Sequence, residues 1–193
     1  MEKQSLASML KGENIKLKTK LDELESTLTR IAGSVHIYSA GTSESKIDLY
    51  SEIVEVINSA RDDIKVVTPK IGPDFANILI EKAKKGNVKI QVVINDRRIL
   101  VEESKLAKIH KKTDVNYEKI YDLLKVTPEV DLINNPNVKF LMVWTRKNVI
   151  FAGGWLEKSL LEKTILLGVH VKDVAKIEEL SEIYKQLLPT FMR

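Results

Sequence analysis

The sequence predicts an α/β domain with a mixed, largely parallel sheet and helices on both faces, preceded by an N-terminal coiled-coil helix. Three observations predict this architecture. Short β-rich runs alternate with amphipathic helical stretches, one strand–helix–strand unit has the length of a parallel crossover, and leucines recur every seven residues near the start. We therefore divide the chain into a dimerisation helix, residues 1–32, and an α/β domain, residues 35–193.

The composition bounds the class of protein. A chain of 193 residues that is 44% hydrophobic can bury a core, and the absence of cysteine excludes disulfides and thiolate metal sites. The charged first thirty residues and the short apolar runs predict a cytoplasmic protein without a signal peptide or a membrane span. We expect no cofactor and no metal. Abundant Ile, Lys and Glu are typical of a thermophile, and the net charge of +4 permits nucleic-acid contact without demanding it.

Within the first thirty-two residues, a heptad repeat fits the sequence from Ala7 onward. Every d position holds a large aliphatic residue, and such a narrow seam favours packing of helix on helix. Asn14 at a core position is a known way to fix register and two-strandedness. We predict a parallel homodimer that is held together by Leu10, Asn14, Leu17, Leu21, Leu24, Leu28 and Ile31. The alternative is a single amphipathic helix that packs back on its own domain.

The first part of the α/β domain reads as strand, helix, strand, helix, strand. Residues 35–41 predict a strand, and apolar residues from Ile47 to Ile57 form one face of a helix. Residues 64–70 predict a buried strand, residues 72–86 a helix with Pro near its start and Gly at its end, and residues 88–96 the next strand. The length of this last unit predicts a right-handed crossover that places its two strands side by side and parallel.

The second part of the domain predicts more strands and a closing helix. A polar helical stretch runs from Arg97 to Lys125, and Asp173 caps a last helix that Pro189 halts. Apolar runs separated by turn signals predict strands at residues 129–133, 138–144, 148–154 and 163–171.

The element order and hydrophobic pattern of residues 35–190 resemble one repeat of the phospholipase D superfamily. The resemblance is carried by IVEVINSARDDIKVVTPKIGPDFANILIEKAKKGNVKIQVVIND and by EVDLINNPNVKFLMVW. Active members carry H-x-K-x-x-x-x-D on the strand that matches residues 138–144. The His attacks phosphorus, the Lys holds the phosphate oxygens, and the Asp orients or charges the His.

This motif is degenerate in the present chain. It places Asn137 at the His position, Lys139 at the Lys position and Trp144 at the Asp position. An amide has no basic lone pair with which to attack phosphorus, and an indole can neither orient an imidazole nor bear a charge. The resemblance therefore implies a pseudoenzyme, and we expect no catalytic residue. An active phosphodiesterase would require a cleft that both protomers assemble from other residues.

The three histidines do not restore the motif. His110 and Lys112 form an H-x-K, but their segment reads as an exposed helix, so we interpret it as an accident of composition. His36 and His170 lie in apolar strands, where they could approach one another across a sheet. We interpret both as hydrogen-bonded strand residues.

Within the superfamily, the chain resembles the coiled coil and effector domain of TrmB-like archaeal transcription regulators. Those proteins are similar in running from a coiled-coil helix into a catalytically dead domain of this fold. The resemblance implies a non-catalytic dimeric regulatory or adaptor protein that binds a small molecule or a protein partner. In these 193 residues we expect neither a winged helix before the coiled coil nor a separate ligand subdomain after the α/β domain, and this expectation argues against direct DNA reading and against sugar binding.

The binding place that we predict is a relict cleft at the carboxyl ends of the parallel strands, where open α/β sheets bind ligands. The candidate contacts are Thr68, Lys70, Asp96, Arg97 and Lys139, and an anionic ligand would suit the three cations among them. The alternative is that these cations are ordinary solvated surface. Trp144 alternates with Met142 and Phe140, which favours a place in the core.

A nucleic-acid-binding role is the alternative function. A basic helix would supply the phosphate contacts, namely Arg97, Arg98, Lys105, Lys108, Lys111 and Lys112. Glu102, Glu103 and Asp114 dilute this patch, and the sequence contains no groove-reading motif.

Overall fold

A computed structural model describes residues 16, 18–20, 35–40, 48–86, 88–109, 115–163 and 166–189. By its internal contacts the chain divides into residues 1–34 and residues 35–193. In the first unit, Lys16 and residues 18–20 are helical and exposed. The residues predicted to hold a dimer together lie outside the described residues, so the coiled coil stays a prediction.

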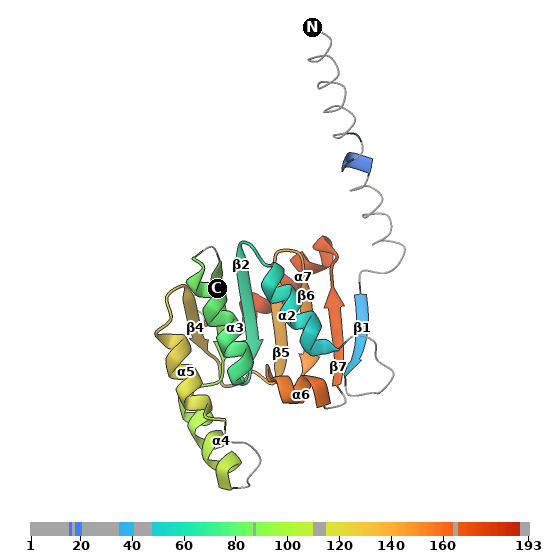
Figure 1. Cartoon of the computed structure of the whole chain (residues 1–193). Coiled ribbons are helices and arrows are strands. Elements are labelled where there is room, and N and C mark those ends of the chain that lie inside the picture. The colour runs from blue at the N-terminus through green and yellow to red at the C-terminus, as the bar shows by residue number, and fades with distance from the viewer. Residues whose placement is uncertain are drawn as a thin grey trace. The chain divides into compact units, whose positions relative to one another are not determined.

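Within the described residues, the second unit contains one sheet of seven strands, in the order β1-β7-β6-β5-β2-β3-β4 (Figure 1). The strands are β1 (Val35–Ala40), β2 (Asp63–Thr68), β3 (Lys89–Ile94), β4 (Val130–Asn134), β5 (Phe140–Thr145), β6 (Val149–Gly153) and β7 (Leu166–Val171). The helices are α2 (Leu49–Ser59), α3 (Pro73–Lys84), α4 (Arg97–Ile109), α5 (Tyr117–Lys125), α6 (Lys158–Lys163) and α7 (Val174–Leu187).

The strand directions confirm a mixed α/β sheet but confine its parallel part to three strands. β2 pairs with β3 and β3 pairs with β4 in parallel, as the predicted crossover requires. The other neighbouring pairs are antiparallel. Parallel pairing is therefore less extensive than we expected. A tight hairpin, in which the Thr145 N–H donates to the Asn148 carbonyl at 2.8 Å, makes β5 and β6 antiparallel.

Helices cover both faces of this sheet, as the sequence predicted. Alternate strand residues such as Ile64, Val66 and Leu141 point to one face, where α2, α3, α5 and α6 pack over them (Figure 1). The intervening residues, such as Val67 and Met142, point to the other face, where α7 packs. The sheet is thus the shared wall of two apolar cores.

The helix boundaries correct the sequence prediction in two places. The stretch from Arg97 to Lys125 contains two helices, and Asn116 begins the second by accepting a 3.0 Å hydrogen bond from the Lys119 N–H. The short helix α6 was not predicted, because six residues are too few to show a helical period. The cap at Asp173 is confirmed, since its carboxylate accepts from the Ala175 N–H at 2.9 Å.

Two successive glycines at the end of β6 give a test of this fold. Gly154 has a φ of 86°, and a Cβ there would lie 2.6 Å from the Leu160 Cδ2, whereas a Cβ on Gly153 meets nothing within 4 Å. We expect Gly154→Ala to lower the free energy of unfolding by about 1–2 kcal/mol, because alanine disfavours the left-handed region. Gly153→Ala is the control and should change it by less than about 0.5 kcal/mol. Urea denaturation measures both, and equal losses would contradict the assigned backbone.

Candidate functional site

The predicted site positions gather at the edge of the sheet where β2 and β6 end and β5 begins. Phe140 pairs with Gly153, and Met142 pairs with Val67, so the start of β5 lies between the ends of its two neighbours. We call this the relict edge and define it by Lys70 after β2, Lys139 before β5 and Trp155 after β6. Asn137 and Lys139 are exposed there.

Trp144 lies away from the relict edge. It is five residues beyond Lys139, which corresponds to about 16 Å along a strand. Its side chain is 6% exposed and packs edge to face on Tyr184 of α7, with ring centroids 5.8 Å apart. Trp144 therefore lies in the core, as its alternation with Met142 predicts.

A backbone seam closes the relict edge. The Thr68 hydroxyl donates to the Lys70 carbonyl at 2.8 Å and accepts from the Leu156 N–H at 3.0 Å. The Gly72 N–H donates to the Leu156 carbonyl at 2.7 Å, and Ile71 bridges to Leu156. Thr68 is completely buried, so its hydroxyl holds the chain after β2 against the chain after β6.

The Lys70 ammonium lies in a cage of aromatic and acidic side chains. Its Nζ is 2.9 Å from a carboxylate oxygen of Glu103 on α4. It lies 4.1 Å from the ring centroid of Trp155 and 4.9 Å from that of Tyr117. Cation–π attraction and an ion pair both hold the charge in place. An anionic ligand at Lys70 would have to compete with Glu103.

Glu157 completes the cage as an acceptor of three hydrogen bonds. Tyr117 Oη, Trp155 Nε1 and Ser159 Oγ each donate to its carboxylate at 2.7 Å. Burial opposes the charge, but these hydrogen bonds and the Lys70 charge prevail and lower the pKa of Glu157 below its ordinary value. Burial, together with the Glu157 hydrogen bond, raises the pKa of Tyr117. The phenol therefore stays a donor and the carboxylate stays an acceptor.

Arg97 is also engaged by carboxylates. Its guanidinium donates to both oxygens of Asp122 at 2.9 Å and lies 2.6 Å from a carboxylate oxygen of Glu118. Hydrogen bonding to Asp122 is the main cause that raises the pKa of Arg97. The arginine thus ties the start of α4 to α5. Two of the three cations predicted for an anionic ligand, Lys70 and Arg97, have carboxylate partners in the structure.

The remaining predicted contacts are distributed as follows. The Asn95 N–H donates to the Pro69 carbonyl, which brings Asp96 next to the chain after β2. Arg98 and Lys105 are exposed on α4. The side chain of Lys108 and all of Lys111 and Lys112 lie outside the described residues, as does His110.

His170 lies far from the relict edge. It pairs with Ile150 near the start of β6, and its backbone is paired with that of His36 on β1, an approach that the sequence left open. The imidazole is 1% exposed, with Nε2 2.9 Å from Asn148 Oδ1 and Nδ1 3.5 Å from a Glu52 oxygen. The structure therefore assigns His170 the hydrogen-bonded strand position that we predicted.

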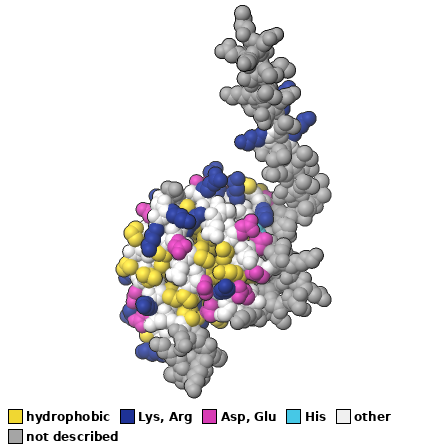
Figure 2. Space-filling model, viewed as in Figure 1, with side chains coloured by type: hydrophobic (Ala, Val, Ile, Leu, Met, Phe, Trp, Pro, Cys, Tyr) yellow, Lys and Arg dark blue, Asp and Glu magenta, His cyan; other side chains and the backbone are white. Residues whose placement is uncertain are grey.

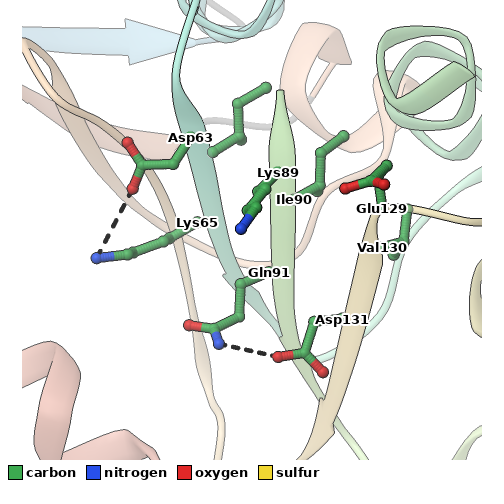
Figure 3. Close-up of a pocket in the computed structure, with 9 residues that line it drawn as sticks. Asp63, Lys65, Lys89, Ile90, Gln91, Glu129, Val130 and Asp131 are labelled. Carbon is green, nitrogen blue, oxygen red and sulfur yellow. Dashed lines mark hydrogen bonds and ion pairs between the residues drawn. The ribbon is translucent and has the colours of Figure 1, made fainter. Parts of the chain in front are cut away.

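A pocket that the sequence did not reveal opens where the parallel strands begin. The hollow has a volume of about 470 Å³. Figure 3 shows that polar side chains surround it, and that they come from β2, β3, β4 and Glu129, the residue before β4. Tyr184 Oη donates to Gln91, and Gln91 Nε2 donates to Asp131 at 3.1 Å. The signal was present as polar residues at alternate positions of each strand start: Asp63 and Lys65, Lys89 and Gln91, Glu129 and Asp131.

An apolar hollow of about 400 Å³ lies beside the relict edge, on the face that α7 partly covers. It is lined by Phe140, Phe151, Ala152, Gly153, Leu167 and Val169. Leu167 is 64% exposed, and the rings of Phe140 and Phe151 are 6.2 Å apart. The exposed Lys139 directly precedes Phe140 in the sequence.

The described residues contain neither a cluster of metal ligands nor a helix able to cross a membrane. Across these parts of the chain, no group of three or more His, Cys, Asp or Glu side chains is arranged to hold a metal ion. In the same parts, no helix has both the length and the apolar character that crossing a membrane requires.

Comparison with known proteins identifies the fold. No protein-family model and no curated protein matches the sequence. NucT from Helicobacter pylori is similar over 79% of this chain and 94% of its own (TM-score 0.59, 14% identity). Nuc from Salmonella typhimurium, a phospholipase D family member, is similar over 79% and 93% (TM-score 0.56, 14% identity).

A third similar structure is that of TrmBL2, an archaeal chromatin protein with a novel mode of DNA binding. The likeness covers 95% of this chain but only 64% of TrmBL2, with a TM-score of 0.51 and 18% identity. The chain thus spans about two thirds of the TrmBL2 chain. Together these likenesses show a phospholipase D-like fold, as the sequence predicted.

The Glu157 network predicts a pH-dependent contribution to stability. We expect Glu157→Gln to lower the free energy of unfolding by roughly 1–2 kcal/mol at neutral pH, because three donors lose a charged acceptor. The pKa of Glu157 is lowered in the folded state, so its contribution is complete above the ordinary value of 4.5 and is lost as the pH falls through the folded value. The difference between the two proteins should shrink in acid.

The matched control is Glu162→Gln, in the same segment of chain. Glu162 lies 3.8 Å from Lys158 in a partly exposed pair, which contributes less than about 0.5 kcal/mol. Chemical denaturation between neutral pH and pH below 4.5 measures both variants. A Glu157→Gln loss that does not depend on pH would contradict the assigned network.

Proposed function

We propose that the chain is a non-catalytic regulatory or adaptor protein of the transcription-regulator type. The observation that carries this proposal is the chemistry of the relict edge. An amide and a lysine, Asn137 and Lys139, are exposed there, and the one histidine side chain that the structure describes, His170, lies elsewhere in hydrogen bonds. Phosphoryl transfer through a phosphohistidine needs a basic nucleophile next to a fixed cation. The described residues of this edge supply the cation but no imidazole.

The apolar hollow favours a protein partner over a small anion. Lys70 already has Glu103 as a partner, and Arg97 has Asp122, so an incoming anion would have to displace carboxylates. Lys139, in contrast, is exposed, and it directly precedes Phe140, which lines the apolar hollow. Exposed apolar surface of this kind is typical of interaction sites. A partner segment that carries an apolar side chain next to a carboxylate would satisfy both features.

The proposal includes a homodimer formed through the N-terminal heptads. An unbroken series of aliphatic d positions, from Leu10 to Ile31, supports it. The likeness to TrmBL2 covers 95% of this chain, against 79% for NucT, and therefore includes residues of the segment that carries the heptads.

Nucleic-acid binding is the second candidate function. The observation that favours it is the likeness to TrmBL2, whose structure shows DNA binding. The exposed Arg98 and Lys105 of α4 are described members of the patch that the sequence suggested. Arg97 contributes less than expected, because Asp122 and Glu118 bind its guanidinium.

The absence of phosphodiester chemistry is directly testable. We expect the purified protein to hydrolyse bis-p-nitrophenyl phosphate no faster than buffer does, because the described residues of the relict edge include no imidazole and the Glu157 carboxylate is engaged by three donors. Lys139→Ala should behave identically. Turnover that Lys139→Ala abolishes would overturn the proposal, whereas turnover that survives it would indicate a site elsewhere or a contaminating enzyme.

The dimer has its own test. We expect Leu21→Lys with Leu24→Lys to reduce the mass seen by light scattering from that of a dimer to the 21.9 kDa of one chain, because two lysines would face their copies in an apolar seam. Ser8→Lys with Ser26→Lys adds the same charge outside the seam and should leave a dimer. An unchanged mass in the leucine variant would contradict the coiled coil.

A further inference from the structure

Seven cations lie at the end of the sheet opposite to the relict edge. They come from three segments: residues 59–63 between α2 and β2, residues 82–89 from α3 into β3, and residues 145–148 in the β5–β6 hairpin. The cations are Arg61, Lys82, Lys84, Lys85, Lys89, Arg146 and Lys147. We call this set the basic edge. In Figure 2, Lys and Arg side chains gather along the upper rim, over the α2–β2 turn, the end of α3 and the hairpin of Figure 1.

Specific contacts hold the three segments together. Lys82 Nζ donates to the Asn58 carbonyl at the end of α2 at 2.6 Å. Arg146 lies 3.6 Å from the Asp62 carboxylate, and the Lys89 N–H donates to the Asp62 carbonyl. A hollow of about 470 Å³ runs between residues 59–63 and 145–148. The three segments therefore lie side by side although they are separated in the sequence.

The charge of the chain is concentrated in this surface. The three segments hold seven Lys and Arg against two Asp, a net charge of +5, while the whole chain carries +4. All other residues together therefore carry a net charge of −1. A composition that looked evenly mixed along the sequence becomes one-sided in the fold, and such concentration raises the local density of polyanions.

Internal pairing accounts for little of this charge. Among the described residues, Arg146 with Asp62 is the one ion pair that the seven side chains make, and the arginine remains 80% exposed. Lys82 donates a hydrogen bond to a backbone carbonyl at the end of α2. Burial together with the charge of Lys85 lowers the pKa of Lys82. The other five cations are exposed. Asp63, Glu129 and Asp131 line the pocket beside Lys89. The exposed cations Arg61, Lys84, Lys85 and Lys147 remain, and their like charges point to a partner outside the chain.

We infer that the basic edge binds the phosphate backbone of duplex nucleic acid without reading its sequence. The three segments contain no aromatic residue, so they offer no stacking platform for single-stranded bases. They also present no exposed large apolar side chain that could insert into a lipid surface. Phosphate contacts by Lys and Arg alone give salt-dependent, sequence-independent binding. This surface differs from the α4 patch and does not depend on the proposal for the relict edge.

Two charge-matched double variants of the full chain test the inference. Arg146→Glu with Lys147→Glu alters the hairpin tip, and Arg98→Glu with Lys105→Glu makes the same change of charge on α4, where both side chains are exposed. Fluorescence anisotropy with a random-sequence DNA duplex, at about 50 and about 200 mM salt, measures affinity and salt slope. Lys84→Glu with Lys85→Glu is a second basic-edge variant, in case circular dichroism shows that the hairpin variant is not folded.

We expect the wild-type chain to bind the duplex at low salt. Either basic-edge variant should lose at least about tenfold in affinity and reduce the salt slope by about 2, because two phosphate contacts disappear. The α4 variant carries the same change of net charge but leaves the basic edge unaltered. Its affinity should therefore stay within about twofold of the wild type. Anionic phospholipid vesicles should show no binding that depends on Arg146 and Lys147.

Three results would overturn the inference. They are no binding to the duplex at low salt, a larger loss in the α4 variant than in the basic-edge variants, and binding to vesicles in place of the duplex. None of the variants alters Lys139 or the apolar hollow, so failure here leaves the proposal for the relict edge standing on its own tests.

Discussion

The seam between the chain after β2 and the chain after β6 is the constraint on which the rest of the site depends. The buried Thr68 hydroxyl and the Leu156 N–H close it, and Gly72 permits it, because a Cβ there would lie 3.0 Å from Glu157 Cγ. Once closed, the seam places Trp155 against Lys70, so that the edge is a fixed network rather than an open cleft. Buried charges persist only when they are paired and hydrogen-bonded, and this network pairs them.

The two ends of the sheet use their cations in opposite ways. At the relict edge Lys70 and Arg97 are bound by carboxylates, and their charges serve to join α4 and α5 to the sheet. At the opposite end, Lys84, Lys85 and Lys147 are exposed, and three segments carry more net charge than the whole chain. The difference lies in the distribution of Asp and Glu, not in the number of cations. Charge therefore supports internal structure at one end and external contact at the other.

The sequence predicted the strands and helices that depend on local hydrophobic periodicity. It did not predict contacts between residues that lie far apart in the sequence. Alternating and helical apolar patterns fixed β2, α3 and β3 and their parallel pairing, as well as the core place of Trp144. The partners of Lys70 and Arg97 could not be predicted, since Glu103 and Asp122 follow 33 and 25 residues later. The basic edge could not be predicted for the same reason, since its three segments are brought together only by the fold.

The apolar hollow and the basic edge lie at opposite ends of β5 and β6, and this arrangement limits how the two surfaces can communicate. The Phe140–Gly153 pair borders the hollow, and residues 145–148 form the other surface, about 16 Å along the strands. The strand residues between them, from Leu141 to Val143, are buried in two cores, and close-packed interiors leave little room for a second arrangement. Coupling between sites needs an element with two arrangements. Partners at the two ends can therefore bind together without competing, and a signal between them would have to pass through residues other than these strands.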